Sequence, residues 1–552
     1  MFETDDEMVP GTVHLVDVAG ILDAKKEGDI VLLPQPSSNI NDPLRWSQRK
    51  KRFQFGFLWF WAFLLAACTN FTGPLFSTFT EVWNCSYSAL NNATALNFLF
   101  LGLGCVFLQP TAMKIGRRII YIFGTVLYII GCIVGGTAKS VVPFYFVNVL
   151  FGIGGAPIDS LVEISSTDVF FMHERSTAFA AMILALYLGS NLAPVASGYV
   201  VVSLDWTWCF WIFLIIMVVL LILQLFIMED TSFRRDFNQT EFESNVLNTI
   251  KSHNSTVNRI DTKENFIIDQ NNDTDSIDPT IPKRTYWKRM QLIELEYTDT
   301  RSWFVIFSRP FLLITFPAVA WAGIVYGAQI MWLSLLLTTQ SLIFSAPPYN
   351  FSASSVGLTN LGAAVGNVLG MIYGGKFVDR LTVKLARRNN GVLEPEMRLW
   401  AMIVPTILNA GGLLAYGLGA NAGAHWAIPT VLGQGLLGFS MASTGAITFT
   451  YVVDSYHKLA SETLVLMLFA RNLIGTAFTF AFQPWLDACG LSLTTWLLFM
   501  MSLVINGTFV FFIYYGKSIR RWTAPTYEKY CDPNYGDFLN RGKRKQSKED
   551  QA

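Results

Sequence analysis

The sequence predicts an all-α membrane protein in which twelve transmembrane helices form two six-helix bundles. Three observations lead to this prediction. Of the 552 residues, 52% are hydrophobic and only 14% are charged, and the mean hydropathy is +0.39, whereas soluble domains carry about 25% charged residues. Apolar runs of about 20 residues, the length that spans a bilayer as a helix, recur along the chain. A long polar segment separates these runs into two blocks of six.

The first block follows a polar N-terminal tail, residues 1–52, and forms the expected N-terminal bundle, residues 53–228. The tail includes MFETDDEMVP and has neither the apolar region nor the small-residue cleavage site of a secretory signal, so we expect it to stay in the cytosol. The six spans of this bundle are predicted at about 53–77, 90–110, 118–138, 142–166, 176–201 and 207–228.

A polar segment, residues 229–302, joins the two blocks. Its composition, as in NSTVNRIDTKENFIIDQNNDTDSID, cannot build a core and predicts a mostly disordered cytosolic linker with a short helix near WKRMQLIELE. The C-terminal bundle, residues 303–516, holds the other six runs, and residues 517–552 form a cytosolic C-terminal tail. The spans of this bundle are predicted at about 310–337, 352–375, 400–419, 426–452, 461–485 and 491–516.

Lysine and arginine residues predict the orientation of the chain. Cytosolic loops of membrane proteins carry an excess of these residues, and the loops on the opposite side here contain essentially only Lys139. We therefore expect a multi-pass membrane protein with both termini in the cytosol. The basic segments are residues 49–52, Lys114 with Arg117 and Arg118, the polar linker, the 376–398 loop, and Lys517 with Arg520 and Arg521.

Glycosylation sequons fit this orientation. Asn84-Cys-Ser and Asn350-Phe-Ser fall in loops that it places outside, where we expect N-glycans. The sequons at Asn238, Asn254 and Asn272 fall in the linker and should stay bare.

Composition and motifs also exclude several classes of function. The formal net charge is zero, so nothing suggests a nucleic-acid partner. The seven cysteines are scattered without a C-x-x-C pair, so we expect no metal site. The Gly-Lys-Ser at 516–518 has Phe511 where a phosphate-binding loop needs its first glycine. We therefore expect a monomeric carrier, not an enzyme, that uses no cofactor and is driven by an ion gradient.

Two loops at corresponding positions of the two blocks carry the most specific motif. GGKFVDRLTVK contains Gly375, Asp379 and Arg380, and QPTAMKIGRR contains the basic residues Lys114, Arg117 and Arg118. The pattern resembles the G-x-x-x-D-R-x-G-R-R signature of the major facilitator superfamily, and the resemblance extends from about residue 42 to 522.

In that superfamily these loops form a charge network that latches the two bundles together, which implies gating roles for the five charged residues of the two motifs. Asp168, beside the sequence His-Glu-Arg, would join the latch. The first loop departs from the signature, with Met113 in place of the family's acid and Gln109 in place of its glycine. There, a simple cluster of cytosolic positive charge is an equally good interpretation.

Further segments resemble a narrower group. GSNLAPVASG (189–198) is similar to a motif of proton-coupled antiporters, although close packing of its small residues also accounts for it. NDPLRWS (41–47), DVFFMHER (168–175), ARRNNGVLEPEMRL (386–399) and YYGKSIRRWT (514–523) resemble a fungal branch of the twelve-span drug:proton group. That branch includes carriers of histidinol and polyamines, so the resemblance implies organic cations as substrates.

Asp159 and Glu163 lie four residues apart in an apolar span. This spacing puts both on one helix face, about 6 Å apart along the axis. Carboxylates in mid-membrane are costly and usually face an interior cavity, so we expect both to bind substrate or to carry the coupling proton. The alternative is structural: they pair with an arginine or cap a helix that Gly154, Gly155 and Pro157 make irregular.

In the superfamily, spans one, four, seven and ten line the central cavity. Carboxylates and aromatic faces together suit an organic cation, although Trp and Tyr also populate membrane interfaces and Trp332 could serve only as such an anchor. The substrate-binding residues implied by the resemblance are Asn70, Asp159, Glu163, Tyr326, Gln329, Trp332 and Tyr451.

The function expected from these residues is proton-coupled transport of organic cations, with polyamines favoured. A multidrug:proton exporter on the same fold is the second interpretation, favoured by the GSNLAPVASG motif. A nutrient sensor that does not transport is the third, and the long linker gives it modest support.

Overall fold

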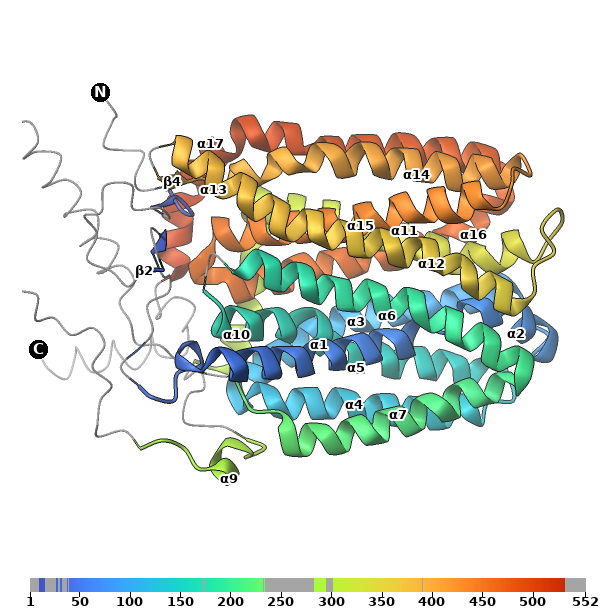
Figure 1. Cartoon of the computed structure of the whole chain (residues 1–552), viewed down its shortest axis with the longest axis horizontal. Coiled ribbons are helices and arrows are strands. Elements are labelled where there is room, and N and C mark those ends of the chain that lie inside the picture. Colours follow the sequence, from blue (N-terminus) through green and yellow to red (C-terminus); the bar gives the residue numbers. More distant parts are fainter. Residues whose placement is uncertain are drawn as a thin grey trace, which may run out of the picture.

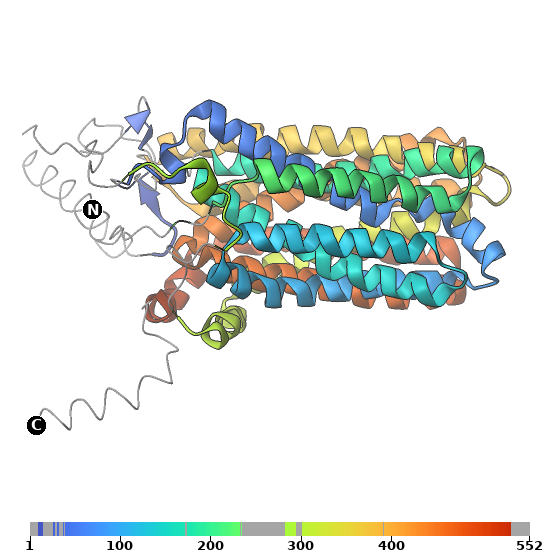
Figure 2. The same cartoon turned by 90° about the horizontal axis from the view of Figure 1, so that it is seen from below.

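The computed structural model describes residues 9–14, 26–27, 30–31, 37, 39–171, 174–231, 233, 282–293, 301–389 and 391–531. Most of the predicted linker, its three sequons and the end of the C-terminal tail lie outside these residues. The described chain is an elongated bundle of roughly parallel helices (Figure 1, Figure 2). The prediction of an all-α membrane fold is confirmed.

The first half contains six long helices. Several begin at a capping side chain, which satisfies an amide that the helix itself leaves unpaired: Ser47 Oγ accepts from Lys50 N (3.4 Å), Ser86 Oγ from Ala89 N (3.3 Å) and Asp205 Oδ1 from Trp206 N (2.8 Å). The elements are α1 (Gln48–Asn70), η3 (Gly73–Leu75), α2 (Phe76–Val82), α3 (Tyr87–Ile115), α4 (Arg117–Gly136), α5 (Val141–Val169), α6 (Arg175–Ser203) and α7 (Trp206–Ile227).

The second half is also helical, and the described part of the segment between the halves contains one short helix. The short helix expected near WKRMQLIELE is present as α9 (Tyr286–Arg289). The second half contains α10 (Trp303–Leu312), η4 (Leu313–Thr315), α11 (Pro317–Phe344), α12 (Ala353–Ile372), η5 (Tyr373–Phe377), α13 (Val378–Arg388), η6 (Pro395–Met402), α14 (Ile403–Asn421), η7 (Ile428–Gly433), α15 (Gln434–Ser455), η8 (His457–Leu459), α16 (Ala460–Gly507) and α17 (Phe509–Cys531).

Eleven helical stretches of the described chain are long and apolar enough to cross a membrane. The last of them, His457–Cys531, is interrupted at Gly490, whose backbone has φ 69° and ψ 167°. This left-handed conformation favours glycine. The chain reverses direction at Gly490. Tyr456 precedes this glycine in the sequence and Thr523 follows it, yet Tyr456 Oη and Thr523 Oγ1 lie 3.1 Å apart. The stretch therefore crosses twice, which gives the predicted twelve spans.

The bundle has two distinct ends. One end, which we call the linker end, holds the start of α1, the end of α7, and helices α9 and α13. The opposite end, which we call the distal end, holds α2 and the 345–352 loop (Figure 1). Ion pairs gather at the linker end: Lys50 and Arg289 with Glu229, Arg117 with Asp168, Arg398 with Asp379 and Asp454, Lys517 with Glu394, and Arg520 with Glu396. The charge asymmetry that predicts a cytosolic face therefore maps to the linker end.

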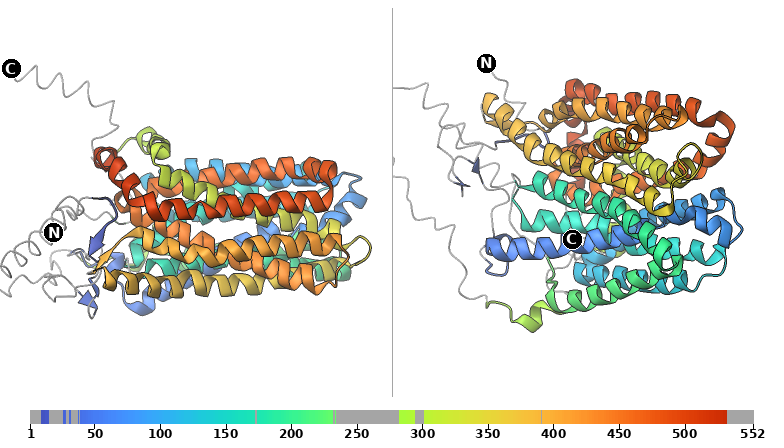
Figure 3. Two further views of the ribbon diagram at one scale, coloured as in Figure 1. Left: turned by 90° about the horizontal axis from the view of Figure 1, so that it is seen from above. Right: turned by 45° about the vertical axis from the view of Figure 1, so that its right-hand side comes forward.

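The two halves pack side by side along their whole length, as the blue-to-green and yellow-to-red helices of Figure 3 show. Helix α6 meets α12 through glycines: a Cβ on Gly198 would lie 2.6 Å from Ala353 O, and one on Gly357 would lie 2.5 Å from Pro194 O. The backbones approach this closely only because neither glycine has a side chain.

Hydrogen bonds join the halves near both ends. Asn91 Nδ2 donates to Gln483 Oε1 (3.2 Å) toward the distal end, and Thr177 Oγ1 donates to Asp379 Oδ2 (3.0 Å) at the linker end. The halves are therefore in contact toward both ends of the bundle.

A short segment of the N-terminal tail docks on the second half at the linker end. Strand β1 (Val13–His14) pairs antiparallel with β4 (Val392–Leu393), and Arg520 Nη1 donates to Pro10 O. Gly11 is buried with φ 84°, and a Cβ there would lie 2.7 Å from Asp454 O, so a larger residue would both strain and clash. A second two-stranded sheet pairs β2 (Lys26–Glu27) with β3 (Ile30–Val31).

Candidate functional site

The candidate site forms where α5 of the first half meets α16 of the second. Asp159 Oδ2 accepts from Arg471 Nη2, and the side chains of both residues are only 3% exposed. Asn472 Nδ2 lies 3.4 Å from the same carboxylate oxygen. A buried ion pair needs such additional polar contacts to offset the loss of water. Asp159 therefore faces the interior, and its charge partner belongs to the other half.

Glycines bring α5 close to its neighbours at this level. A Cβ on Gly152 would lie 2.6 Å from Asn97 O of α3, and one on Gly154 would lie 2.9 Å from Gly124 O of α4. Helix α5 nevertheless runs without interruption from Val141 to Val169 with Pro157 inside it. The alternative in which Asp159 caps a broken helix is therefore wrong, whereas the alternative in which it pairs with an arginine describes the contact observed.

Arg471 has further neighbours besides Asp159. Its guanidinium carbon lies 4.7 Å from the centroid of the Tyr326 ring, and its Nη2 donates to Asn472 Oδ1 at 3.2 Å. Its Nε has no hydrogen-bond partner among the described residues. Sequence reasoning missed Arg471, although an arginine inside the apolar run 461–485 was a usable signal.

The other predicted substrate residues are spread more widely. Glu163 lies one helical turn beyond Asp159 on α5, and its side chain is outside the described residues. Gln329 on α11 is buried and donates to Asn506 Oδ1 at 3.2 Å. Asn70 donates to Ser190 Oγ at 2.9 Å. It lines a separate polar cleft with residues that include Thr94, Asn97, Asn148 and Thr338.

Two aromatic residues of the predicted set lie among other rings. Trp332 is fully buried and packs edge-on against Phe478, with ring centroids 6.5 Å apart, so the alternative in which it anchors the chain at the membrane interface is wrong. Tyr451 packs edge-on against Trp321, with ring centroids 5.6 Å apart. Of the predicted aromatic residues, Tyr326 is the one whose ring stacks on the Asp159-bound guanidinium.

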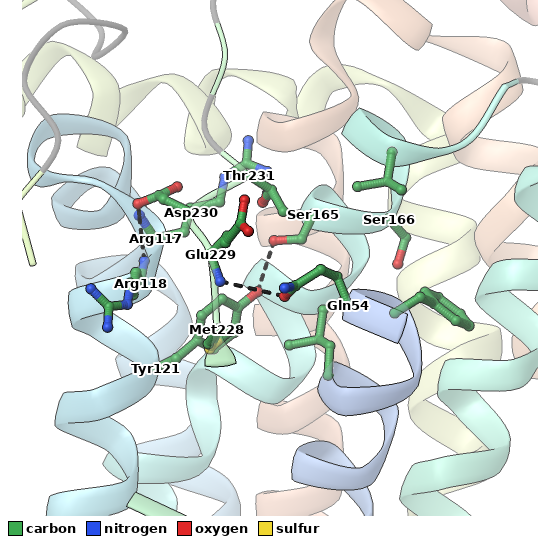
Figure 4. A pocket seen from close by; sticks show the side chains of 13 residues that line it. Gln54, Arg117, Arg118, Tyr121, Ser165, Ser166, Met228, Glu229, Asp230 and Thr231 are labelled. Atoms are coloured by element: carbon green, nitrogen blue, oxygen red, sulfur yellow. Dashed lines mark hydrogen bonds between the residues drawn. The ribbon is translucent and has the colours of Figure 1, made fainter. Parts of the chain in front are cut away.

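The first signature loop uses acids that lie elsewhere in the sequence. Arg117 forms an ion pair with Asp168, and Asp230 Oδ2 accepts from the backbone nitrogens of Arg117 (3.0 Å) and Arg118 (3.2 Å), as Figure 4 shows for Asp230. A carboxylate at these amides also complements the positive end of the α4 dipole. Asp168 and Asp230 thus provide the negative charge that Met113 cannot, and neither contact reaches the second half.

The remaining basic residues of this loop differ. The Arg118 guanidinium donates to the carbonyl oxygens of Leu225 (2.7 Å), Gln291 (3.1 Å) and Met290, and thereby joins the end of α7 to a later part of the linker. Lys114 makes no ion pair within the described part of the chain. Next to these residues lies a small cleft whose lining includes Gln54, Tyr121 and Ser165 (Figure 4).

The second signature loop does connect the two halves. Asp379 Oδ1 accepts from Arg398 Nη1 (3.1 Å), and its Oδ2 accepts from Thr177 of α6 (3.0 Å). Arg398 Nε also donates to Asp454 Oδ2 at 2.7 Å. Arg380 is exposed, so the base that binds Asp379 is Arg398, which sequence reasoning missed.

The two predicted glycosylation sites lie at the distal end. Asn84 and Asn350 are both exposed, and both adopt positive φ, of 46° and 49°. Asparagine tolerates this conformation better than most residues. Among the described residues no group of three or more His, Cys, Asp or Glu side chains could hold a metal.

Fold and site together define a membrane transporter of two helical halves with a buried charge between them. The family model of the Major Facilitator Superfamily matches residues 58–479, and the chain belongs to this superfamily.

Two relatives match over nearly their whole length. An uncharacterized MFS-type transporter of Schizosaccharomyces pombe is 31% identical over 92% of this chain and 91% of its own. Protein HOL1 of Saccharomyces cerevisiae is 28% identical over 94% and 97%. Among solved structures, the proton:xylose symporter XylE has a TM-score of 0.56 at 13% identity, covering 85% of this chain and 97% of its own, which is a likeness of fold.

Proposed function

We propose that this protein is a proton-coupled secondary transporter that moves organic cations, polyamines above all, across the plasma membrane by alternating access. The observation that carries the proposal is the carboxylate of Asp159, which is buried in the middle of a spanning helix where the two halves meet. Such charges are costly and usually belong to a transport path or a proton relay. A negative charge attracts cations, and the nearby Tyr326 ring adds a favourable cation–π surface.

Membership of the superfamily supports transport, and the resemblance to the fungal drug:proton branch supports organic cations as the substrate class. The proposed partners are the cation, protons and the lipid bilayer, and the proposed state is a monomer with both termini in the cytosol. The cluster of charges at the linker end supports this orientation.

Alternating access is supported by the contacts between the halves. Opening the linker end requires the bond from Thr177 to Asp379 to break, whereas opening the distal end requires the bond from Asn91 to Gln483 to break. Each opening leaves the other contact available, so the carrier can expose its centre to one side at a time.

Proton coupling is proposed for Asp159 and Glu163. A single carboxyl group that holds either a proton or a cation would exchange one for the other, whereas uptake driven by a proton gradient requires both to be carried together. Asp159 and Glu163 provide two carboxyl groups one helical turn apart on α5, so that one can hold the cation while the other holds the proton.

Uptake of labelled spermidine in cells without endogenous carriers tests the proposal directly. We expect uptake above that of cells carrying an empty vector, and we expect a protonophore to abolish it. Uptake that is insensitive to the protonophore would reject proton coupling. Absence of flux for spermidine, spermine and putrescine at normal surface abundance would reject polyamines as substrates.

A multidrug exporter is the second candidate, favoured by the antiporter-like motif on α6. The motif also has a packing role, since a Cβ on Gly189 would lie 2.4 Å from Phe63 O of α1. Faster loss of a preloaded dye from expressing cells, without spermidine uptake, would favour export. Measurable flux in either direction would reject a sensor that does not transport.

A further inference from the structure

We propose that Arg471 is a built-in counter-cation, which neutralises Asp159 when the carrier is empty and gives up this place to the transported cation. This inference rests on the proposed function and assigns a role to a residue outside the recognised motifs. It accounts for a buried ion pair in which each half of the carrier supplies one charge.

The first step of the argument is the cost of an empty, closed site. In this structure the halves are in contact toward both ends and Asp159 is 3% exposed. A carboxylate that is buried without a partner is strongly unfavourable. A carrier without substrate would therefore stall before the closed state unless something else neutralised the carboxylate. Arg471 does so from the opposite half, and the pair forms as the halves come together.

The second step is that Arg471 has other partners when a cation displaces it. Its guanidinium already stacks on Tyr326, with 4.7 Å between the guanidinium carbon and the ring centroid, and it donates to Asn472 Oδ1 at 3.2 Å. Its Nε is not engaged by any described residue. A small rotation away from Asp159 would therefore leave the arginine stacked and hydrogen-bonded, while the carboxylate becomes available to the substrate.

The third step separates two kinds of flux. Net uptake requires the empty carrier to return through the closed state, whereas exchange of substrate across the membrane does not. Loss of the counter-cation should therefore impair net uptake and spare exchange. A residue that only stabilises the fold would affect both fluxes equally, through the number of active carriers.

The first test measures labelled spermidine in net uptake and in exchange against unlabelled spermidine, in vesicles from cells expressing each variant. In Arg471→Gln we expect net uptake to fall about 100-fold, because an unpaired buried carboxylate must form on each return. Exchange should stay within about threefold of wild type. Arg471→Lys keeps the charge and should preserve net uptake, and the exposed Arg52→Gln serves as the matched control.

The second test does not require a carrier with an unpaired carboxylate to fold. Asp159→Asn leaves Arg471 as an uncompensated positive charge beside the substrate, whereas Asp159→Asn/Arg471→Gln removes both charges. The double variant should bind spermidine about tenfold more tightly than the single variant, measured as the apparent KM in exchange.

The outcomes discriminate between the hypotheses. Equal loss of net uptake and exchange in Arg471→Gln, or no gain of affinity in the double variant, would overturn the counter-cation role. Wild-type carrier without flux of spermidine in either assay would instead overturn the proposed function on which the inference rests.

Discussion

Replacing Thr177 by valine should make the linker end open more readily. Thr177 Oγ1 donates to Asp379 Oδ2 at 3.0 Å and thereby joins α6 of the first half to α13 of the second. Valine keeps the shape of threonine but has no hydroxyl group. The bond exists only while the linker end is closed, so its loss destabilises the closed arrangement and leaves the open one unchanged.

The expected magnitude follows from the surroundings of Asp379. A hydrogen bond to a charged group contributes about 1.5–3 kcal/mol. The Asp379 side chain is 19% exposed and keeps its contact with Arg398 at 3.1 Å, so water and the arginine replace part of what is lost. We therefore expect a net effect of about 1 kcal/mol, which corresponds to a roughly fivefold shift toward the state that is open at the linker end.

A cysteine at Ala180 would report this shift. Ala180 is buried on α6 and faces the second half. A Cβ added to Gly375 would lie 3.2 Å from the Cβ of Ala180. An impermeant maleimide can reach this position only when the halves separate at the linker end. With the three partly exposed native cysteines replaced by serine, Thr177→Val should raise the labelling rate about fivefold.

Thr382→Val is the matched control. Thr382 is buried on α13, three residues after Asp379, but its hydroxyl donates to Val378 O at 2.8 Å within its own helix. The control should leave labelling at Ala180→Cys unchanged. If Thr177→Val gave the wild-type rate, or if Thr382→Val raised the rate equally, the bond between the halves would not be part of the gate.

Three further predictions concern the remaining sites. Asp159→Asn should weaken the apparent affinity for a transported cation about ten- to hundredfold through loss of a charge-assisted contact. The control Glu81→Gln, at an exposed position, should leave this affinity unchanged. Normal affinity of Asp159→Asn at normal abundance would remove Asp159 from the site. Glu163→Gln should flatten the pH dependence of uptake and spare exchange, which uptake measured across pH would show, and an unchanged pH profile would exclude it as the proton carrier. Glycosidase treatment should change the electrophoretic mobility of the protein only when Asn84 or Asn350 is present. A glycan on any linker sequon would show that the predicted orientation is wrong.

The helical fold was predictable because a bilayer imposes a minimum length of apolar helix, which can be counted along a sequence. Its details were less predictable. The first span was expected at 53–77, whereas α1 ends at Asn70 and the chain turns through η3 before continuing as α2. Pro74, which has no amide hydrogen, lies in that turn. Apolar composition continues across the turn, so hydropathy alone does not locate it.

The buried acid of the candidate site was predictable, and its partner was not. Asp159 stood out as a charge in an apolar span, but 312 residues separate it from Arg471. Local periodicity carries no information about such a distance. A rule that every buried charge needs an opposite charge would have linked Asp159 to the arginine inside the run 461–485.

The linker-end contacts show the same limit on a smaller scale. The signature motif identified the two loops, but their actual partners, Asp230 for the first and Arg398 for the second, lie outside the motif. The motif's own Arg380 is exposed to solvent. Which charges meet at the end of a bundle depends on how the helices are tilted and placed, and this is decided by packing throughout the fold.

The docked segment of the N-terminal tail also has a consequence for biosynthesis. Residues 9–14 are made before any of the spans, whereas their partner strand β4 is made after the eighth span and Arg520 after the last. The segment therefore waits on the linker-end side while eight spans are inserted before β4 and twelve before Arg520. Its docking is a late event that requires a finished second half, and a product truncated before Arg520 would leave Pro10 without its guanidinium.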